Sequence, residues 1–282
     1  YHTSGYVGLP TGYTMVDHEI ADIPLESWHK MVMAIDDAKT PYVGAMDYRG
    51  TLRIGSESYS IAHVNHLREA GQLVLYNQHN GHYTHTGDDG TEVLVKLAEG
   101  QTWGVNKVLE AKVEKVAKGK GNMQIPAGCA VLSGNGAVAD ALGALSVGST
   151  VKITLNLTLE GNAKSFSEVI GGDIRSLIIK GGVVSTADVW DELHPRTGFG
   201  YTADRKTAIH CVVDGRSTIS TGATTKDLAE IMKFVGAYDA INLDGGGSSC
   251  LFLKDFGPMN KNSDGQERAV SNGIYVVSTA PT

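Results

Sequence analysis

The sequence predicts an α+β protein, a sheet-rich mixed fold with a strand–helix–strand (βαβ) unit near the C-terminus. Apolar and polar residues alternate strictly from Val151 to Leu159, the pattern of a strand with one buried face. Glycine is abundant, with 35 residues among 282, which suits a chain with many turns. Near the C-terminus, a helical repeat of apolar residues lies between two short apolar runs. Together these patterns predict sheet as the dominant structure.

The composition is that of an ordinary globular protein and excludes several classes. Hydrophobic residues make up 41% and charged residues 20% of the chain, so it can bury a sizeable core. The net charge is −7 and no dense Lys/Arg run occurs, which argues against a nucleic-acid partner. No apolar run reaches the length of a membrane span. We predict a single domain over residues 1–282.

Three portions of this domain differ in their pattern. Residues 1–70 are mixed, and short helices are predicted over Leu25–Asp37 and Ile61–Glu69. Residues 71–160 are strand-rich, and residues 161–282 form the core that carries the motifs. The elements predicted in the strand-rich portion are strands over Leu73–Tyr76, Glu92–Leu97, Lys107–Val116 and Val151–Leu159 and a short helix over Ala137–Leu145. The Lys107–Val116 stretch fits a helix almost as well as a strand.

The βαβ unit begins with a predicted strand over Thr207–Val213. Thr224 or Thr225 is the N-cap of the helix that follows, whose apolar positions recur at i, i+3, i+4 and i+7. The second strand is Ala240–Leu243. Strand, helix and strand in this spacing predict two parallel strands joined by a right-handed crossover.

A glycine turn after the second strand is the most informative motif of the chain. It reads Asn242-Leu243-Asp244-Gly245-Gly246-Gly247-Ser248-Ser249. Glycines permit positive φ and a close approach of ligand to backbone, and successive N–H groups can converge on an anion. A tight turn would also need small residues, but the acid and the serines favour a ligand site. Parallel strands would bring Asp214 and Asp244 to neighbouring strand ends, where ligands bind in open α/β sheets.

Two further clusters carry charges that suit a phosphate or carboxylate. One is His194-Pro195-Arg196-Thr197-Gly198, in which a proline-fixed turn would hold an arginine for a two-point contact. The other runs from Ser263 to Asn272 and precedes a predicted final strand over Gly273–Val277. Its adjacent Glu267 and Arg268 would point to opposite faces of an extended chain, so both reach one cleft only if the chain bends. Surface loops would explain either cluster equally well.

Histidines gather in a third cluster, His79-Asn80-Gly81-His82-Tyr83-Thr84-His85, near Asp88 and Asp89. With His63 and His66 it has the residue types of a metal site, but it lacks zinc-type spacing and lies between two predicted strands. A solvated hairpin loop is the favoured interpretation. The cysteines Cys129, Cys211 and Cys250 each have apolar neighbours and are predicted to be buried rather than paired or reactive.

Taken in order, these motifs resemble the phosphodiester glycosidase family. The resemblance is strongest over His194–Val277 and rests on His194-Pro195-Arg196-Thr197, Val212-Val213-Asp214-Gly215-Arg216, Asn242 to Ser249, and Glu267-Arg268 followed by Val270-Ser271-Asn272. Four ordered motifs make a specific signal, while Leu73–Leu159 resembles the family more loosely. In the family, an early Asn-Gly-rich strand belongs to the site; here it would precede Gly8-Leu9-Pro10-Thr11-Gly12, so we expect this chain to begin just after it.

The resemblance implies that a sugar-1-phosphodiester is cleaved at the anomeric C–O bond, which releases free sugar and a phosphomonoester. A phosphomonoester already leaves well, so the site must chiefly receive its negative charge. Arg196, Arg268 and the N–H groups of Gly245–Gly247 suit that task. A carboxylate must activate water or attack the anomeric carbon, and Asp244 is the first candidate and Glu267 the second.

The other site residues are expected to bind substrate and hold the turns. They are Asp214, Arg216, Gly245, Gly246, Gly247, Ser248, Ser249, Arg268, Asn272 and Thr197. No metal ligand and no cofactor is assigned. The expected partner is a small molecule or glycan that carries a sugar-1-phosphodiester, and the resemblance implies an extracellular or periplasmic bacterial protein.

Two other functions remain open from the sequence. One is a metal-dependent phosphodiesterase that breaks the P–O bond with the histidine cluster as ligands. The other is a non-catalytic module that binds a glycan or a sugar phosphate. The position of label after hydrolysis in oxygen-18 water separates C–O from P–O cleavage, and binding without turnover identifies the module.

Overall fold

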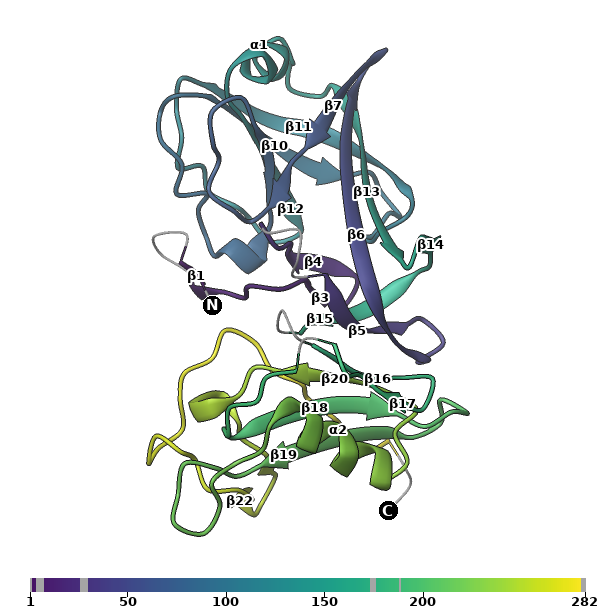
Figure 1. Ribbon diagram of the computed structural model, residues 1–282. Coiled ribbons are helices and arrows are strands. Elements are labelled where there is room, and N and C mark those ends of the chain that lie inside the picture. Colours follow the sequence, from purple (N-terminus) through teal and green to yellow (C-terminus); the bar gives the residue numbers. More distant parts are fainter. Residues whose placement is uncertain (1, 4–7, 26–29, 173–175, 188, 280–282) are drawn as a thin grey trace.

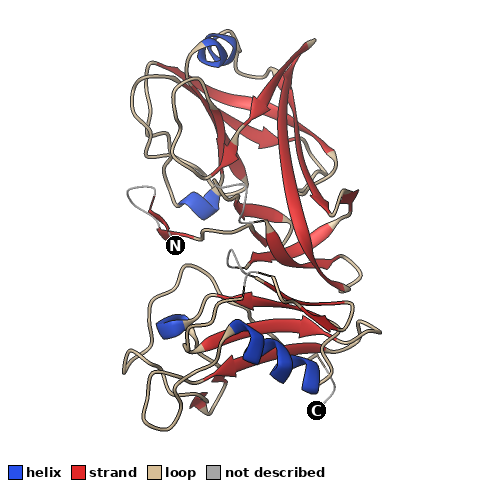
Figure 2. Cartoon of the chain, viewed as in Figure 1, coloured by secondary structure: helices blue, strands red, loops and turns tan. Residues whose placement is uncertain are grey.

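The computed structural model describes residues 2–3, 8–25, 30–172, 176–187 and 189–279. Two β-sheets lie one above the other in Figure 1, and the chain passes from the upper sheet to the lower one after β15 (Phe166–Gly171). Figure 2 shows how little helix accompanies them. The described helices are α1 (Ala137–Gly143), α2 (Thr225–Phe234) and the 3-10 turns η1 (Gln78–Asn80) and η2 (Gly246–Ser248). The predicted dominance of sheet is therefore confirmed.

The larger sheet is built from the first 171 residues. Its strands are β3 (Thr14–Val16), β4 (Glu19–Asp22), β5 (Met31–Asp36), β6 (Pro41–Ile54), β7 (Glu57–Ile61), β8 (His63–Val64), β9 (Leu73–Tyr76), β10 (Thr91–Leu97), β11 (Val108–Lys118), β12 (Cys129–Gly134), β13 (Thr150–Leu159), β14 (Asn162–Ala163) and β15. They are arranged in the order β4-β3-β15-β5-β6-β13-β11-β10-β12-β9-β8, with β7 on β6 and β14 on β13. Within this described sheet, β8 and β9 pair in parallel and the other pairs are antiparallel.

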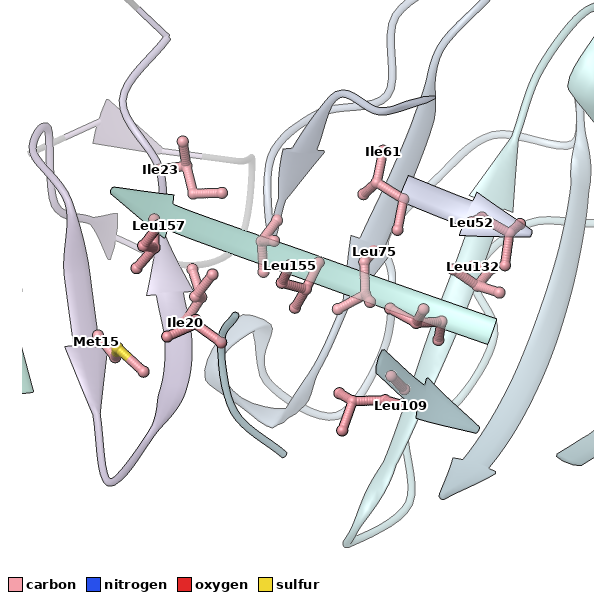
Figure 3. Close-up of a cluster of buried hydrophobic side chains, with 14 of the residues drawn as sticks. Met15, Ile20, Ile23, Leu52, Ile61, Leu75, Leu109, Leu132, Leu155 and Leu157 are labelled. Carbon is pink, nitrogen blue, oxygen red and sulfur yellow. The ribbon is translucent and has the colours of Figure 1, made fainter. Parts of the chain in front are cut away.

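This sheet curls around one hydrophobic core because its two ends meet. Strand β4 contacts β8, although the two are the terminal strands of the sheet. Figure 3 shows Met15 and Ile20 from one end gathered with Leu75 from the other around Leu155 of β13. The alternation in β13 is confirmed, since its apolar residues from 151 to 159 are all buried.

The two helices predicted in the first 70 residues are wrong. Strand β5 lies within Leu25–Asp37 (residues 26–29 are outside the described part), and β8 lies within Ile61–Glu69. Strand β5 is buried on both faces, with Val32 in the core of the first sheet and Met33 in a second cluster, so it lacks the alternation that marks a strand. The other predicted elements of this sheet are confirmed as β9, β10, β11, β13 and α1.

The smaller sheet carries the motifs. Its strands are β16 (Leu177–Lys180), β17 (Val183–Val184), β18 (Arg196–Tyr201), β19 (Ala208–Val213) and β20 (Asp239–Leu243), in the antiparallel order β17-β16-β20-β18-β19. Helix α2 covers one face through Leu228 and Met232. The other face packs Phe199 and Ile241 against Met33 of β5. One hydrophobic cluster therefore joins the two sheets.

The two strands of the predicted βαβ unit are not neighbours as expected, because β18 lies between them. Strands β19 and β20 each pair antiparallel with β18 and thus run in the same direction, with α2 connecting them. Their C-terminal residues Val213 and Leu243 pair with Arg196 and Thr197 at the start of β18. Three strand ends therefore meet at one edge of the sheet. Thr224 is the N-cap of α2, and a complete capping box with Asp227 forms there.

The predicted final strand over Gly273–Val277 is also wrong. These residues form no strand with any part of the chain that the structure describes, and Tyr275 and Val276 are exposed. A run of apolar residues has strand propensity, but a strand also needs a free neighbouring edge. Two short antiparallel strand pairs complete the fold, β1 (His2–Thr3) with β2 (Gly8–Leu9) and β21 (Phe252–Leu253) with β22 (Gly257–Pro258). Among the described helices, none is long and apolar enough to cross a membrane. The single-domain organisation stays a prediction.

Candidate functional site

A cavity of about 780 Å³ opens beside the three strand ends of the smaller sheet. Its wall combines β18 to β20 and the glycine turn with Pro10–Gly12, Ile170–Gly172 and the segment from Glu267 to Ile274. Residues from both ends of the chain thus reach the same space. A Cβ atom on Gly171 would lie 2.6 Å from the Cα of Gly12, so glycine is required where these two segments touch. The cavity is large enough for a small ligand such as a sugar phosphate.

Asp244 is the first residue after β20 and is exposed in this cavity. Its Oδ1 accepts a hydrogen bond of 2.8 Å from the N–H of Gly245. The preceding strand is fully buried, from Asp239 to Leu243. A carboxylate at the end of a buried strand is held in place while its reactive atoms remain open to solvent.

Four N–H groups in and after the glycine turn donate within the protein, whereas the sequence suggested that they converge on an anion. Gly245 donates to Asp244, and Gly246 donates to the carbonyl of Pro195 at 2.9 Å. Ser248 and Ser249 donate to the carbonyls of Gly245 and Gly246, because the turn closes into the 3-10 turn η2. These four donors are used inside the protein, so they stabilise the turn rather than a ligand.

The glycines instead make room for two arginines. Gly246 has a φ of +61°, and a Cβ atom there would lie 3.1 Å from both terminal nitrogens of Arg216. A Cβ atom on Gly247 would collide with the guanidinium of Arg268 and the carboxylate of Asp264. Guanidinium groups therefore rest directly on the backbone of two successive glycines. Two guanidinium groups, one of them paired with Asp264, therefore lie at the turn.

Glu267 and Arg268 both line the cavity, because the chain turns at residues 263–266 just before them. Arg268 is 45% exposed and donates through Nε to Oδ2 of Asp264 at 2.8 Å, with Nη2 at 2.6 Å from the same oxygen. This pairing fixes the guanidinium while part of it remains accessible. Among the described residues of the wall, the charged side chains are Arg268, Asp244 and Glu267.

Arg196 does not reach the cavity. It is 3% exposed, and its Nε and Nη2 donate to the carbonyls of Ala223 at 2.9 Å and Glu192 at 2.7 Å. Neighbouring strand residues point to opposite faces, so Thr197 lines the cavity while Arg196 lies on the side of α2. The expected direct contact of Arg196 with phosphate is corrected to a role in holding the loops around the site.

Asp214 and Arg216 also lie outside the wall. Oδ1 of Asp214 accepts from the N–H of Lys261 at 3.0 Å and from the side chain of Asn260 at 3.3 Å. Nε of Arg216 lies 3.3 Å from Nδ1 of His194. Asp214 therefore ties down the segment that follows the glycine turn, and Arg216 braces the turn from outside.

The remaining predicted residues connect the wall to its surroundings. Ser249 is buried, and its hydroxyl lies 2.9 Å from that of Thr197. Asn272 donates from Nδ2 to the hydroxyl of Thr14 at 3.0 Å, which links the C-terminal segment to the first sheet. Ser248 lines the cavity and is half-buried.

The structure adds cavity residues that the sequence analysis missed or misplaced. Trp190 and His210 both line the wall. Burial lowers the pKa of His210, which packs edge-on against Phe199, and so favours the neutral form of its ring. Cys250 is exposed in the wall rather than buried as predicted, because it follows the turn and not a strand. Partial burial and the Glu267 carboxylate raise the pKa of the Cys250 thiol, which disfavours the thiolate.

The histidine cluster lies in the other half of the molecule. His79 sits in η1, and His82 and His85 follow in the loop before β10. Within the described part of the chain, no three His, Cys, Asp or Glu side chains are placed to share a metal ion.

Comparison with known proteins places the chain in a family. A model of the phosphodiester glycosidase family matches residues 99–277, which is more than half of the sequence. The chain belongs to the phosphodiester glycosidase family. The matched range includes the glycine turn, Glu267 and Arg268, and thus every charged residue of the described wall.

The individual proteins that this phosphodiester glycosidase family member resembles either have low sequence identity or match it over only part of its length. The SPbeta prophage-derived protein YomE of Bacillus subtilis (strain 168) is 38% identical over 90 residues, which are 31% of this chain and 14% of YomE. A predicted exported protein from Burkholderia pseudomallei K96243 has a TM-score of 0.66 at 19% identity, over 91% of this chain and 58% of its own. A hypothetical protein from Synechocystis has a TM-score of 0.63 at 18% identity. The match covers 93% of this chain and 48% of the Synechocystis protein. The chain thus spans about half the length of these two structures, which share its fold.

Proposed function

We propose that this protein hydrolyses a sugar-1-phosphodiester at the anomeric C–O bond and releases free sugar and a phosphomonoester. The observation that carries the proposal is one cavity in whose described wall the charged side chains are two carboxylates and one guanidinium. Such a set supplies a base or nucleophile and a receiver of negative charge. Membership of the phosphodiester glycosidase family supports the same reaction class.

In the proposed reaction, the carboxylate of Asp244 takes a proton from a water molecule, whose oxygen forms the new bond to the anomeric carbon. The bond between that carbon and the bridging oxygen breaks, and its electron pair goes to the phosphate. The leaving phosphomonoester thereby gains one negative charge. Because this group is a weak base, charge stabilisation matters more than proton donation. Glu267 is the second candidate for the role of Asp244.

Arg268 is the proposed receiver of that charge. Its guanidinium lies on Gly247, is held by Asp264 and remains 45% exposed at the wall. A guanidinium fixed before the reaction stabilises developing charge without first having to reorient. Arg216 adds a second positive charge at Gly246. Thr197, Ser248 and Asn272, which line the wall, are the proposed partners of the substrate's hydroxyl groups.

We further propose that the substrate is a glycan or small molecule met outside the cytosol, in the periplasm or beyond the cell. The likeness in fold to an exported bacterial protein supports this setting. Cell fractionation of the organism that encodes the chain, with an antibody against the chain, tests it.

The direct test replaces Asp244 with Asn, which keeps the shape of the side chain and removes its negative charge. On a panel of α-sugar-1-phosphate diesters, Asp244→Asn should lower sugar release by roughly 100-fold or more. Asp140→Asn, on the exposed side of α1, is the matched control and should remain active. A folded Asp244→Asn protein with normal activity removes this residue from the mechanism, and Glu267→Gln then becomes the decisive variant.

Two further measurements distinguish the proposed reaction from the two other functions that the sequence leaves open. Loss of activity with a chelator, and also in His82→Ala, would favour a metal-dependent phosphodiesterase. Binding of a sugar 1-phosphate without turnover of any diester in the panel would favour a non-catalytic module.

A further inference from the structure

Trp190 is a feature of the cavity wall that the proposed reaction does not use. It lies in the loop between β17 and β18, is half-buried and faces the same cavity as Asp244. An aromatic side chain at the surface of a polar cavity calls for a physical reason, because its exposed part contacts water unless a ligand covers it.

Hydrogen bonds hold Trp190 in place from several directions. Its backbone N–H donates to Oγ1 of Thr225 at 2.8 Å, and the N–H of Thr225 donates back to its carbonyl at 3.1 Å. Thr225 is the first residue of α2, so the loop is anchored to a helix end. The indole Nε1–H donates to Oε2 of Glu192 at 2.8 Å, which fixes the orientation of the ring.

Arg196 supports the indole ring. The central carbon of its guanidinium lies 5.1 Å from the ring centroid, within the range of a cation–π contact. Because the guanidinium donates to the carbonyls of Ala223 and Glu192, the support is itself fixed. His194 approaches the ring edge-on, with centroids 6.5 Å apart and planes at 88°. The position of Trp190 is therefore set before any ligand arrives, which lowers the entropy cost of binding.

We propose that Trp190 is the platform on which the sugar ring of the substrate packs. This inference rests on the proposed function and names the part of the substrate that the wall recognises. A pyranose has one face of C–H bonds, and the electron-rich face of an indole attracts their positive hydrogens. The C–H face of a hexopyranose would cover the exposed part of Trp190, while its hydroxyls reach Thr197 and Ser248. Arg196 is then a positioning residue, since it acts through Trp190.

Steady-state measurements of KM and kcat test whether the sugar ring packs on Trp190. The substrate is α-D-glucose 1-phosphate or α-D-N-acetylglucosamine 1-phosphate whose phosphate carries one methyl ester group. The compound that the wild-type protein cleaves faster is used. Trp190→Ala should raise KM by roughly 10- to 100-fold and change kcat by less than about threefold, because the ring contacts the sugar in ground state and transition state alike. Trp190→Phe should recover part of the affinity. Trp103→Phe, in the first half of the chain, is the matched control.

Fluorescence tests the same contact without turnover. Titration of the wild-type protein with α-D-glucose 1-phosphate should change the tryptophan emission. Trp190→Phe should abolish that change, and Trp103→Phe should retain it. This arm also works if no diester is cleaved, so a failed reaction and a failed platform are distinguishable.

Three results would overturn the platform. One is an unchanged KM in a folded Trp190→Ala protein. Another is a lower kcat at constant KM, which points to a structural role. The third is an emission change that persists in Trp190→Phe. If Trp190→Ala fails to fold by circular dichroism, Trp190→Phe decides the question alone.

Discussion

Gly247 shows how a single missing side chain shapes the site. A Cβ atom at this position would collide with both members of the Asp264–Arg268 ion pair. The three glycines stand out in the sequence, and their importance was predicted correctly in kind but not in mechanism. We expected N–H groups aimed at an anion, whereas the backbone gives up space to arginine side chains. That distinction depends on where Arg216 and Arg268 lie in the fold, and a local sequence pattern does not reveal this.

The first prediction at this scale concerns Gly247→Ala. The added methyl group should displace Arg268 and lower kcat/KM by about 10- to 1,000-fold, in the range for loss of one positioned charge-stabilising donor. Gly87→Ala is the control, since a Cβ atom there would meet only the flexible side chain of Asp89, at 3.3 Å. Steady-state kinetics on the diester panel checks both variants. Activity within threefold of wild type in folded Gly247→Ala would contradict the role given to Arg268.

Sequence patterns predicted several strands and helices of the chain, but they missed β5 and the order of the strands in the smaller sheet. The alternation of apolar and polar residues was sufficient to predict β13. The N-cap signal at Thr224 was sufficient to predict the start of α2. Strand β5 was missed because its two faces serve two different clusters. The insertion of β18 between β19 and β20 was missed because strand order is a property of the whole sheet. For the same reason, Arg196 was expected in a loop rather than at a strand start with its side chain turned away from the cavity.

A second prediction concerns the N-cap of α2. Thr224→Ala removes the side-chain acceptor for the N–H of Asp227, so the free energy of unfolding should fall by about 0.5–2 kcal/mol. Urea denaturation followed by far-UV circular dichroism measures it. Thr102→Ala, at an exposed position, should change stability by less than about 0.5 kcal/mol. Equal stabilities of wild type and Thr224→Ala would show that the capping box contributes nothing measurable.

A third prediction follows from the histidine of β8. Burial, followed by the positive charge of His66, lowers the pKa of His63 from 6.5, against smaller opposing effects of Glu69 and Asp22. The unfolded chain therefore binds a proton near pH 6.5 that the folded chain does not, so stability should decline as pH falls below about 7. His210, whose pKa is also lowered, adds an effect of the same sign.

Urea titrations at pH 7.5 and pH 5.5 check this expectation. The loss of stability between the two pH values should be smaller in His63→Gln than in the wild-type protein. The same loss in both would mean that His63 does not contribute to the pH dependence.

At the scale of the whole molecule, the site depends on contacts between the two sheets. Phe199 and Ile241 of the smaller sheet pack against Met33 and Val43 of the larger one. The hydrogen bond from Asn272 to Thr14 joins the C-terminal segment of the cavity wall to the larger sheet. Neither contact is visible in local sequence patterns, because each joins residues more than a hundred positions apart.

Phe199→Ala provides the fourth prediction. Removal of a ring that is 1% exposed should cost about 3–5 kcal/mol of stability, since it leaves a cavity between the sheets. If the chain is one cooperative domain, peptides from β10 and β18 should lose hydrogen-exchange protection together in increasing urea. Protection of β10 that survives after β18 has exchanged would show two independently folding parts.

In the proposed function, the residues of one cavity break the bond between the anomeric carbon and the phosphate oxygen. Hydrolysis of a cleaved diester in oxygen-18 water, followed by mass spectrometry of both products, tests it most directly. We expect the label to appear in the released sugar and the phosphomonoester to be unlabelled. Label in the phosphomonoester would contradict the account, because water would then have attacked phosphorus.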